Sequence, residues 1–425
     1  MEVNKMKKIF ALLLACLMVA GMFAGCGSKA DDTPSVYYLN FKPEFNDALT
    51  ALAAKYTEKT GIEVKIVTAA SGTYSSSLTA NIKDVTIFNI GNAAGLADWD
   101  EYALDLTGSA IAKELSTNDF NLYNANGELK AIGNCYESYG IIVNTKLLAQ
   151  AGYSLSQITN YETLKACVED IHARSAELGF DAFTSSGLAP NSSWRFSGHL
   201  ATLPLHYEGI DSDVATIKGT YMNLFKNVWD LYINNAATTG AELNNEALDA
   251  AAEFKQGKAV FYQNGTWEYS GLKEAGMSDA DLAMIPIYCG AEGEENAALC
   301  SGTENRWAIN AKASEADQKA SIDFLVWLVS DPEAAAVYVE NMGAVPFKNA
   351  PAATNKFVKD GNAMLAAGKT SISWAFNYTP NVDAWRATVV TALAAYSADA
   401  TEANWNEVVK AFVEGWAYEY GVVHG

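Results

Sequence analysis

The chain has 425 residues and a formal net charge of −21, because 50 acidic residues outnumber 29 basic ones. This charge repels nucleic acids and anionic lipid surfaces, so proteins that bind either through a basic surface are excluded. Half of the residues are hydrophobic, which excludes a disordered chain, and a chain of this length normally folds as two domains.

The N-terminal segment has the pattern of a secretory signal. Three lysines within the first eight residues precede an uncharged apolar run from Ile9 to Ala24. The run is shorter than the ~20 residues of a membrane span, and the small residues before Cys26 resemble a bacterial lipobox. We therefore expect a signal peptide over residues 1–25, a lipidated Cys26 that anchors the chain in a membrane, and a tether over 26–34. Phe23 occupies the lipobox position where leucine is more usual. An ordinary signal peptide cleaved at another position is therefore the alternative.

From residue 36 onward, apolar runs alternate with helical periodicity. The first helix begins at Pro43 and is expected to stop at Gly61. Strands are predicted at 36–41, 62–67, 85–90, 139–144, 180–184, 259–262, 282–288 and 307–310. Helices are predicted at 44–60, 74–82, 146–151, 161–178, 221–234, 245–256, 315–329 and 404–418. This alternation indicates an α/β protein with parallel, doubly wound sheets.

Four cysteines follow the lipobox, at Cys135, Cys167, Cys289 and Cys300. None belongs to a Cys-x-x-Cys pair, and with four histidines no zinc-type spacing appears, so we expect no metal site. Cys289 and Cys300 are close enough in sequence for a local disulfide, and buried free thiols are the alternative.

Enzyme motifs are absent from the sequence. It contains no Gly-rich phosphate loop, no Gly-x-Ser-x-Gly elbow and no His-Glu-x-x-His. A glycosidase would need two carboxylates facing a sugar, and no acidic motif stands out. We therefore expect a protein without catalytic residues or cofactor.

The most informative internal segment is Gln263-Asn-Gly-Thr-Trp-Glu268, which directly follows a predicted strand. In open α/β sheets, ligands lie outside the carboxyl ends of strands. Trp267 is therefore expected to stack on a pyranose face, while Asn264 and Glu268 bind hydroxyl groups. The alternative is a tryptophan that only closes the edge of the core.

Two further loop segments offer similar chemistry. Trp194 with Arg195 follows a proline, and Trp374 lies in a segment without helical periodicity. Both tryptophans are candidates for stacking on a sugar, and packing is the alternative for each. Five other tryptophans lie on helical patterns and are expected in the core: Trp229, Trp327, Trp385, Trp405 and Trp416.

Together these features resemble the extracellular solute-binding proteins of bacterial carbohydrate ABC importers, the maltose-binding-protein-like class. Residues 139–152 resemble the family's first crossing strand with its helix, and 258–268 resemble its G-K-A-A-M-x-x-x-G-x-W segment. Residues 324–346 resemble its hinge helix and Gly-x-x-Pro turn. The segment 38–44 is similar to the opening of sugar-binding lipoproteins of Gram-positive bacteria, whereas 75–84 is shorter than expected before the third strand.

The resemblance implies a two-lobed periplasmic-binding-protein-like fold, in which each lobe is a mainly parallel sheet flanked by helices. Three crossings join the lobes, and the ligand cleft lies between them. We assign 34–140 plus 290–330 to lobe one and 141–289 plus 331–425 to lobe two. Three glutamates near predicted strand ends or crossings are expected to add to the polar lining of the cleft, namely Glu44, Glu137 and Glu304.

The function that the resemblance implies is the solute-binding subunit of an ABC importer. It would capture a sugar, an oligosaccharide, by hinge closure and deliver it to the membrane permease subunits. The lipid anchor would hold it at the extracellular face of a Gram-positive cell membrane. The alternatives are a binding protein for a non-sugar solute, such as a peptide, polyamine or iron chelate, and a surface enzyme that degrades glycans.

Overall fold

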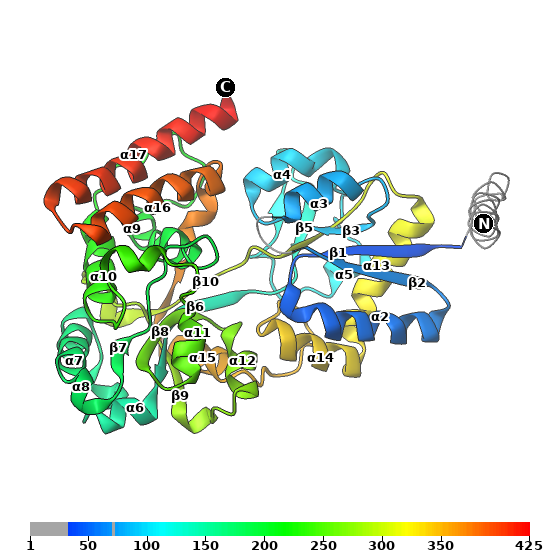
Figure 1. Cartoon of the computed structure of the whole chain (residues 1–425). Coiled ribbons are helices and arrows are strands. Elements are labelled where there is room, and N and C mark those ends of the chain that lie inside the picture. Colours follow the sequence, from blue (N-terminus) through cyan, green and yellow to red (C-terminus); the bar gives the residue numbers. More distant parts are fainter. Residues whose placement is uncertain (1–32, 70–72) are drawn as a thin grey trace, which may run out of the picture.

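We describe a computed structural model, which covers residues 33–69 and 73–425. The predicted signal peptide and Cys26 lie outside the described residues. The described chain forms two lobes side by side, each a sheet with helices packed around it (Figure 1). The two-lobed α/β fold is therefore confirmed.

The sheet of lobe one has the strand order β2-β1-β3-β11-β5-β4. Its first three strands are parallel, whereas β11 runs antiparallel to both β3 and β5. The strands are β1 (Ser35–Asn40), β2 (Glu63–Thr68), β3 (Ile87–Asn89), β4 (Leu122–Tyr123), β5 (Leu129–Gly133) and β11 (Arg306–Ile309). This sheet is thus mixed rather than mainly parallel.

Helices of lobe one pack their apolar sides on this sheet. Gly61 ends α2 in the left-handed conformation, with φ of 76°, as its place after the periodic run predicts. Phe45, Trp307 and Tyr338 meet in the core, and Trp327 is partly buried against it. The helices are α2 (Asn46–Thr60), α3 (Tyr74–Asn81), α4 (Ala93–Trp99), α5 (Ala110–Lys113), α13 (Glu315–Ser330) and α14 (Pro332–Met342).

The sheet of lobe two has the order β12-β10-β6-β8-β7, and β9 also pairs with β6. β6 runs antiparallel to β8, β9 and β10, while β7 with β8 and β10 with β12 are parallel pairs. The strands are β6 (Glu137–Asn144), β7 (Asp181–Phe183), β8 (Ala259–Gly265), β9 (Leu282–Ile285), β10 (Ala297–Gly302) and β12 (Thr370–Ser373). The opposite direction of β6 makes this sheet mixed as well.

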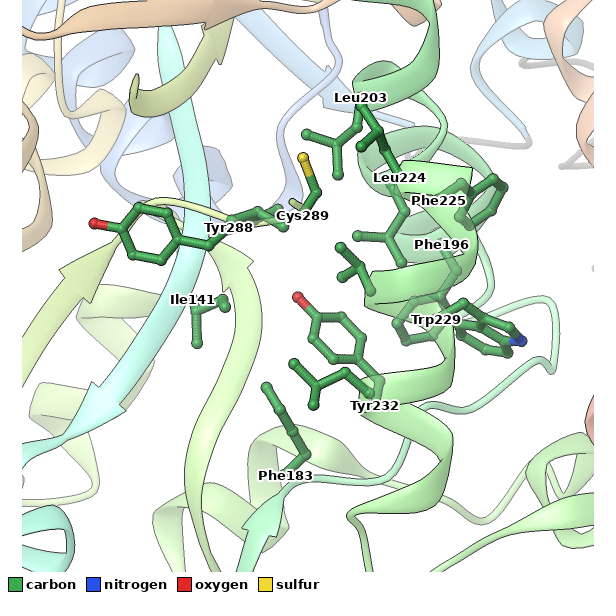
Figure 2. Packing of buried hydrophobic residues seen from close by; sticks show 14 of the residues in the cluster. Ile141, Phe183, Phe196, Leu203, Leu224, Phe225, Trp229, Tyr232, Tyr288 and Cys289 are labelled. Atoms are coloured by element: carbon green, nitrogen blue, oxygen red, sulfur yellow. The ribbon is translucent and has the colours of Figure 1, made fainter. Parts of the chain in front are cut away.

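Figure 2 shows the core of lobe two around α10 (Met222–Asn234), whose Trp229 ring lies 4.8 Å from Phe196 and whose Tyr232 ring lies 4.4 Å from Phe183. Trp229, Trp385 and Trp416 are fully buried and Trp405 is buried, as predicted. The helices are α6 (Thr145–Gln150), α7 (Tyr161–Ala173), α8 (Ser175–Leu178), α9 (Thr202–Glu208), α10 (Met222–Asn234), α11 (Ala250–Lys255), α12 (Glu268–Glu274), α15 (Lys356–Ala366), α16 (Val382–Ala398) and α17 (Glu402–His424). No helix within 33–69 and 73–425 is both long and apolar enough to span a membrane.

Three short segments connect the lobes: 134–136 between β5 and β6, 303–305 between β10 and β11, and 343–355 between α14 and α15. Backbone hydrogen bonds connect the first crossing to each of the other two. The Asn134 amide donates to the Asn305 carbonyl at 3.1 Å, and the Tyr136 amide donates to the Ala344 carbonyl at 2.9 Å. The crossings therefore form one connected hinge.

The sheets divide the chain differently from the predicted lobe ranges. β10 was assigned to lobe one, but it pairs with β6 in the sheet of lobe two. Residues 137–140 were also assigned to lobe one, but they form the start of β6. The helix α14 was assigned to lobe two, but it packs on the core of lobe one beside α2 (Figure 1). The reason is Tyr338, whose ring lies edge-on to Phe45 with centroids 5.5 Å apart.

Two local expectations also change. The predicted helix 245–256 is confined to α11, because the Asp249 carboxylate accepts a hydrogen bond from the Ala252 amide and caps the helix there. The four cysteines among the described residues are buried free thiols, so Cys289 and Cys300 form no local disulfide.

Candidate ligand-binding cleft

A cleft of about 310 Å³ lies between the two lobes, within the range of small-molecule sites. It contains three tryptophans from lobe two and several charged side chains from lobe one and the crossings. We call it the interlobe cleft. It is lined by Phe41, Lys42, Pro43, Glu44, Glu137, Trp194, His199, Trp267, Glu304, Asn305, Trp374, Phe376 and Arg386.

Strand ends position these side chains. In lobe two, the start of β6 lies beside the ends of β8 and β10, because Tyr139 pairs with Gly265 and Glu137 with Gly302. Trp374 directly follows the end of β12, and Trp267 is the second residue after the end of β8. In lobe one, Lys42 and Glu44 follow β1, whose parallel neighbours end at the same edge. The cleft thus lies at the carboxyl ends of strands, as expected for open α/β sheets.

The lobe-two side of the cleft is an aromatic wall, formed by Trp194, His199, Trp267, Trp374 and Phe376. His199 contacts Trp194 edge-on with centroids 5.0 Å apart, and it lies 5.6 Å from Trp267. Trp374 stacks with Phe376 at 5.6 Å. Such faces suit the apolar C–H face of a sugar ring.

Two glycines allow the tryptophan rings of this wall to lie close to the backbone. A Cβ atom on Gly265 would lie 2.2 Å from the Trp267 ring, and one on Gly302 would lie 2.6 Å from Trp374. Both distances are shorter than any real contact, so a side chain at either glycine would displace a ring of the wall.

His199 contributes a neutral ring. Burial, together with the cations Arg386 and Arg195, holds the pKa of His199 well below its usual value. Its Nδ1 atom lies 3.0 Å from Gln263 Nε2, which can only donate. A π-helical turn, Arg195–Leu200, carries this histidine, and such turns are frequent at functional sites.

The side of the cleft opposite the aromatic wall is polar and joins the lobes, because Lys42 follows β1 of lobe one and Glu137 begins β6 of lobe two. The Lys42 ammonium forms a buried ion pair with Glu137 and a second one with the half-exposed Glu44 at 3.1 Å. Burial alone would lower the pKa of Lys42, but the two carboxylates raise it above its usual value. The Asn40 side chain fixes the turn, because it bonds both the amide and the carbonyl of Lys42.

Three buried polar atoms of the cleft have no hydrogen-bond partner among the residues that the structure describes. They are the Asn305 Oδ1 acceptor and the Nε donors of Trp374 (Nε1) and Arg386. Arg386 lies 4.0 Å from Glu304 and covers the Phe376 ring with its guanidinium at 5.0 Å. Unpartnered buried groups cost free energy unless a ligand supplies the missing partner.

Six of the nine predicted site residues line the interlobe cleft: Glu44, Glu137, Trp194, Trp267, Glu304 and Trp374. The other three, Arg195, Asn264 and Glu268, lie together in a neighbouring pocket of lobe two. Asn264 Nδ2 donates to Glu268 Oε1 at 3.1 Å there, and Arg195 donates to the Gln263 and Ser185 carbonyls. These three residues therefore do not line the interlobe cleft, and their role in ligand binding stays a prediction.

Sequence reasoning missed four polar residues of the cleft. Lys42 lies directly after the first strand, and Asn305 follows the predicted Glu304, so strand-end position could have indicated both. His199 lies four residues beyond the predicted Arg195. Arg386 lies on a regular helix, α16, and no local signal marks it. No three His, Cys, Asp or Glu side chains gather for a metal within 33–69 and 73–425.

A two-lobed fold with a ligand-sized cleft at the hinge is the architecture of a solute-binding protein. A profile of the family described as "Bacterial extracellular solute-binding protein" matches residues 51–367, which is most of the chain. The chain belongs to this family.

One curated relative is a carbohydrate ABC transporter substrate-binding protein from Streptococcus pneumoniae. It is 26% identical over 291 residues, which cover 56% of this chain and 58% of the relative. The match thus spans less than two thirds of the relative's length.

Two solved structures have a similar fold. RafE of Streptococcus pneumoniae, in complex with raffinose, is 16% identical with a TM-score of 0.67, covering 91% of this chain and 100% of RafE. The GacH receptor of Streptomyces glaucescens, described unliganded and with acarbose, is 16% identical with a TM-score of 0.68, covering 92% of this chain and 99% of GacH. At these identities, the similarity establishes the fold.

Proposed function

We propose that the protein captures a neutral sugar in the interlobe cleft and delivers it to the membrane subunits of an ABC importer. The observation that carries this proposal is an aromatic wall that faces polar side chains across the cleft. We call these side chains, Lys42, Glu44, Glu137, Glu304 and Asn305, the polar edge. Trp194, Trp267 and Trp374 offer faces for sugar rings, while the polar edge offers partners for hydroxyl groups.

The unpartnered atoms support a hydroxylated ligand. These atoms are closed off in the form described, so a ligand reaches them only when the surrounding side chains or the lobes shift. A sugar hydroxyl both donates and accepts, so it would then suit the Asn305 acceptor as well as the Trp374 and Arg386 donors. A ligand with acceptors only, or with ammonium donors only, would leave part of this set unpaired.

The charges support a neutral ligand. Lys42 lies against two carboxylates, and Arg386 lies 4.0 Å from both Glu304 and Asp383. A polyamine would need carboxylates free of cationic partners, and an acidic sugar would need a free cation. The relatives named for carbohydrate, raffinose and acarbose support the same ligand class.

Hinge closure would couple binding to delivery. The sugar would contact the aromatic wall of lobe two in both the open and the closed form of the protein. Its contacts with Lys42, Glu44 and Asn305 would be complete only in the closed form, when the lobes approach each other. A ligand shifts such an equilibrium by its difference in affinity for the two forms. For the closed form to dominate, the contacts with lobe one must supply that difference.

A thermal-shift screen of the chain from residue 33 onward tests the ligand class. The panel includes mono- and oligosaccharides, spermidine and short peptides. A ligand present at 100 times its dissociation constant stabilises the folded state by about 2.7 kcal/mol. We expect the sugars to raise the melting temperature and the other solutes to leave it unchanged. A shift with spermidine or peptides alone would contradict the proposal, and sugar hydrolysis during incubation would favour the alternative of an enzyme.

We further propose that Cys26 is lipidated after removal of residues 1–25 and holds the protein at the outer face of a membrane. The lipobox-like sequence before Cys26 supports this anchor. Cys26→Ser is expected to release folded, sugar-binding protein into the medium or to leave unprocessed precursor. Membrane retention of a correctly cleaved, unlipidated chain would contradict this proposal.

A further inference from the structure

Lobe two contains a second pocket next to the interlobe cleft. We call it the lobe-two pocket; its volume is about 420 Å³. Its walls come from residues 191–195, from 246–251 before and at the start of α11, and from the end of β8 with the start of α12. Every lining residue belongs to lobe two, so the shape of this pocket does not depend on the hinge angle.

Trp194 is the residue that the linings of the two cavities share. The ring is half-buried, and its Nε1 donates to the Asn191 carbonyl at 3.1 Å, which fixes its orientation. It also packs edge-on against His199 in the aromatic wall. A fixed aromatic ring therefore separates two cavities that a chain of linked rings could occupy together.

The lobe-two pocket has the polar groups of a hydroxyl-binding site. Buried Asn264 bonds Glu268, and burial raises the pKa of Glu268 above its usual value, against the opposing effect of Arg195. Exposed Glu246 and Asp249 lie at the mouth of the pocket. The Asn264 amide is already bonded within the protein, since its Oδ1 accepts from the Gly265 amide and its Nδ2 donates to Tyr262 as well as Glu268. The acceptors offered to a ligand are therefore carboxylates, which beside a tryptophan suit a sugar ring rather than an apolar group.

We propose that the lobe-two pocket is a second sugar subsite, and that the ligand is an oligosaccharide that passes Trp194 with one unit in each cavity. This inference rests on the proposed function of the interlobe cleft. It also accounts for Arg195, Asn264 and Glu268, which lie outside that cleft although each is within three residues in sequence of one that lines it.

The two subsites play different thermodynamic roles. Contacts in the lobe-two pocket are the same in open and closed protein, so they strengthen binding to both forms equally and do not favour closure. Contacts in the interlobe cleft change with the hinge angle. The second unit therefore raises affinity, whereas the unit in the interlobe cleft determines the degree of closure.

Calorimetry with two ligand series tests this assignment: glucose, maltose and maltotriose, and galactose, melibiose and raffinose. We expect at least one series to gain tenfold or more in affinity on lengthening. Ala247→Trp, which fills the mouth of the lobe-two pocket from an exposed loop, is expected to abolish that gain. It should leave the affinity for the shortest ligand within twofold. Glu268→Gln should reduce the gain at least threefold.

The matched control is Glu242→Gln, which removes the same charge from an exposed position outside both cavities. It should leave both affinities unchanged. Small-angle scattering adds a second readout, because the radius of gyration at saturation should be the same for short and long ligands.

The outcomes separate the two proposals. If a sugar binds but affinity does not rise with length, or if Ala247→Trp weakens short and long ligands equally, the second subsite is wrong and the proposed function stands. If no sugar of either series binds the unmodified protein, both proposals fail for these ligands. A gain with length that survives both Ala247→Trp and Glu268→Gln would place the added unit elsewhere and overturn the assignment.

Discussion

The two sides of the interlobe cleft differ in how their groups are held. The aromatic wall of lobe two is fixed by packing, with Trp267 against Gly265 and Trp374 against Gly302. The polar edge near lobe one is held by charge, since Lys42 lies between Glu137 and Glu44. A rigid aromatic wall can bind the sugar before the lobes close. The polar edge near the hinge can add contacts to the sugar as the lobes close. The two sides can therefore be tested separately.

Breaking the charged edge should have the largest effect, and on stability rather than on binding alone. Lys42→Ala leaves Glu137 buried without its cation, and removing one partner of a buried pair costs about 3–5 kcal/mol. Urea unfolding at pH 7 measures this loss. The control Glu44→Gln removes a half-exposed partner, so its cost should stay within about 1 kcal/mol. Equal losses in the two variants would show that the pair is not the main support of this edge.

Breaking the aromatic wall should affect binding more than folding. Trp267→Ala removes a half-buried ring from the cleft and should weaken sugar binding by about 1–3 kcal/mol, the usual contribution of a buried aromatic face. Calorimetry measures the affinity, and circular dichroism confirms that the fold is retained. An unchanged affinity would exclude Trp267 as the stacking residue.

The neutral histidine of the wall should give stability a pH dependence. The folded-state pKa of His199 lies below its unfolded value of about 6.5, so below that pH the unfolded chain takes up a proton that the folded protein does not. Stability should then fall by up to about 1.4 kcal/mol per pH unit, with no contribution above pH 7. His199→Gln should flatten the decrease between pH 7 and 5, whereas exposed His424→Gln should not. Parallel profiles for parent and His199→Gln would contradict this role.

The smallest effect concerns one unpartnered donor. Trp374→Phe keeps an aromatic face but removes the buried Nε1 donor, so affinity for a sugar should fall by about 0.5–1.5 kcal/mol. Trp194→Phe makes the same change where Nε1 already donates to Asn191. The difference between the two variants isolates the hydrogen bond to the ligand. If both lose the same affinity, Trp374 Nε1 does not bind the sugar.

Sequence reasoning was most successful where a residue's place follows from a strand end. Trp267 and Glu44 follow predicted strands, and strand ends of an open α/β sheet meet at one edge, so their presence in the cleft could be predicted. Trp374 follows β12, a strand that was not predicted, and it was a candidate only because its segment lacks helical periodicity. The alternation of buried runs likewise predicted most strands of each lobe, but it missed β4, β5, β10 and β12. These features depend on local patterns that the chain shows directly.

The errors concern features that no local pattern contains. Asn264 and Glu268 are neighbours of Trp267 in sequence, but the Trp267 ring folds over Gly265 into the cleft while the other two face the lobe-two pocket. Arg386 reaches the cleft from a helix in the last part of the chain. The position of α14 depends on Tyr338 packing on Phe45, a contact between distant segments.

The pairing of β5 with β11 shows how the lobes are nested. Gly133 ends β5 and pairs directly with Arg306, the first residue of its antiparallel neighbour β11. In terms of connectivity, the two strands form a β-hairpin whose loop has been replaced by most of lobe two. A tight turn of a few residues could join them, since antiparallel neighbours need no longer connection. Lobe one could then be made as a continuous chain, whereas lobe two is closed by segments on both sides of α14 and has no such shortcut.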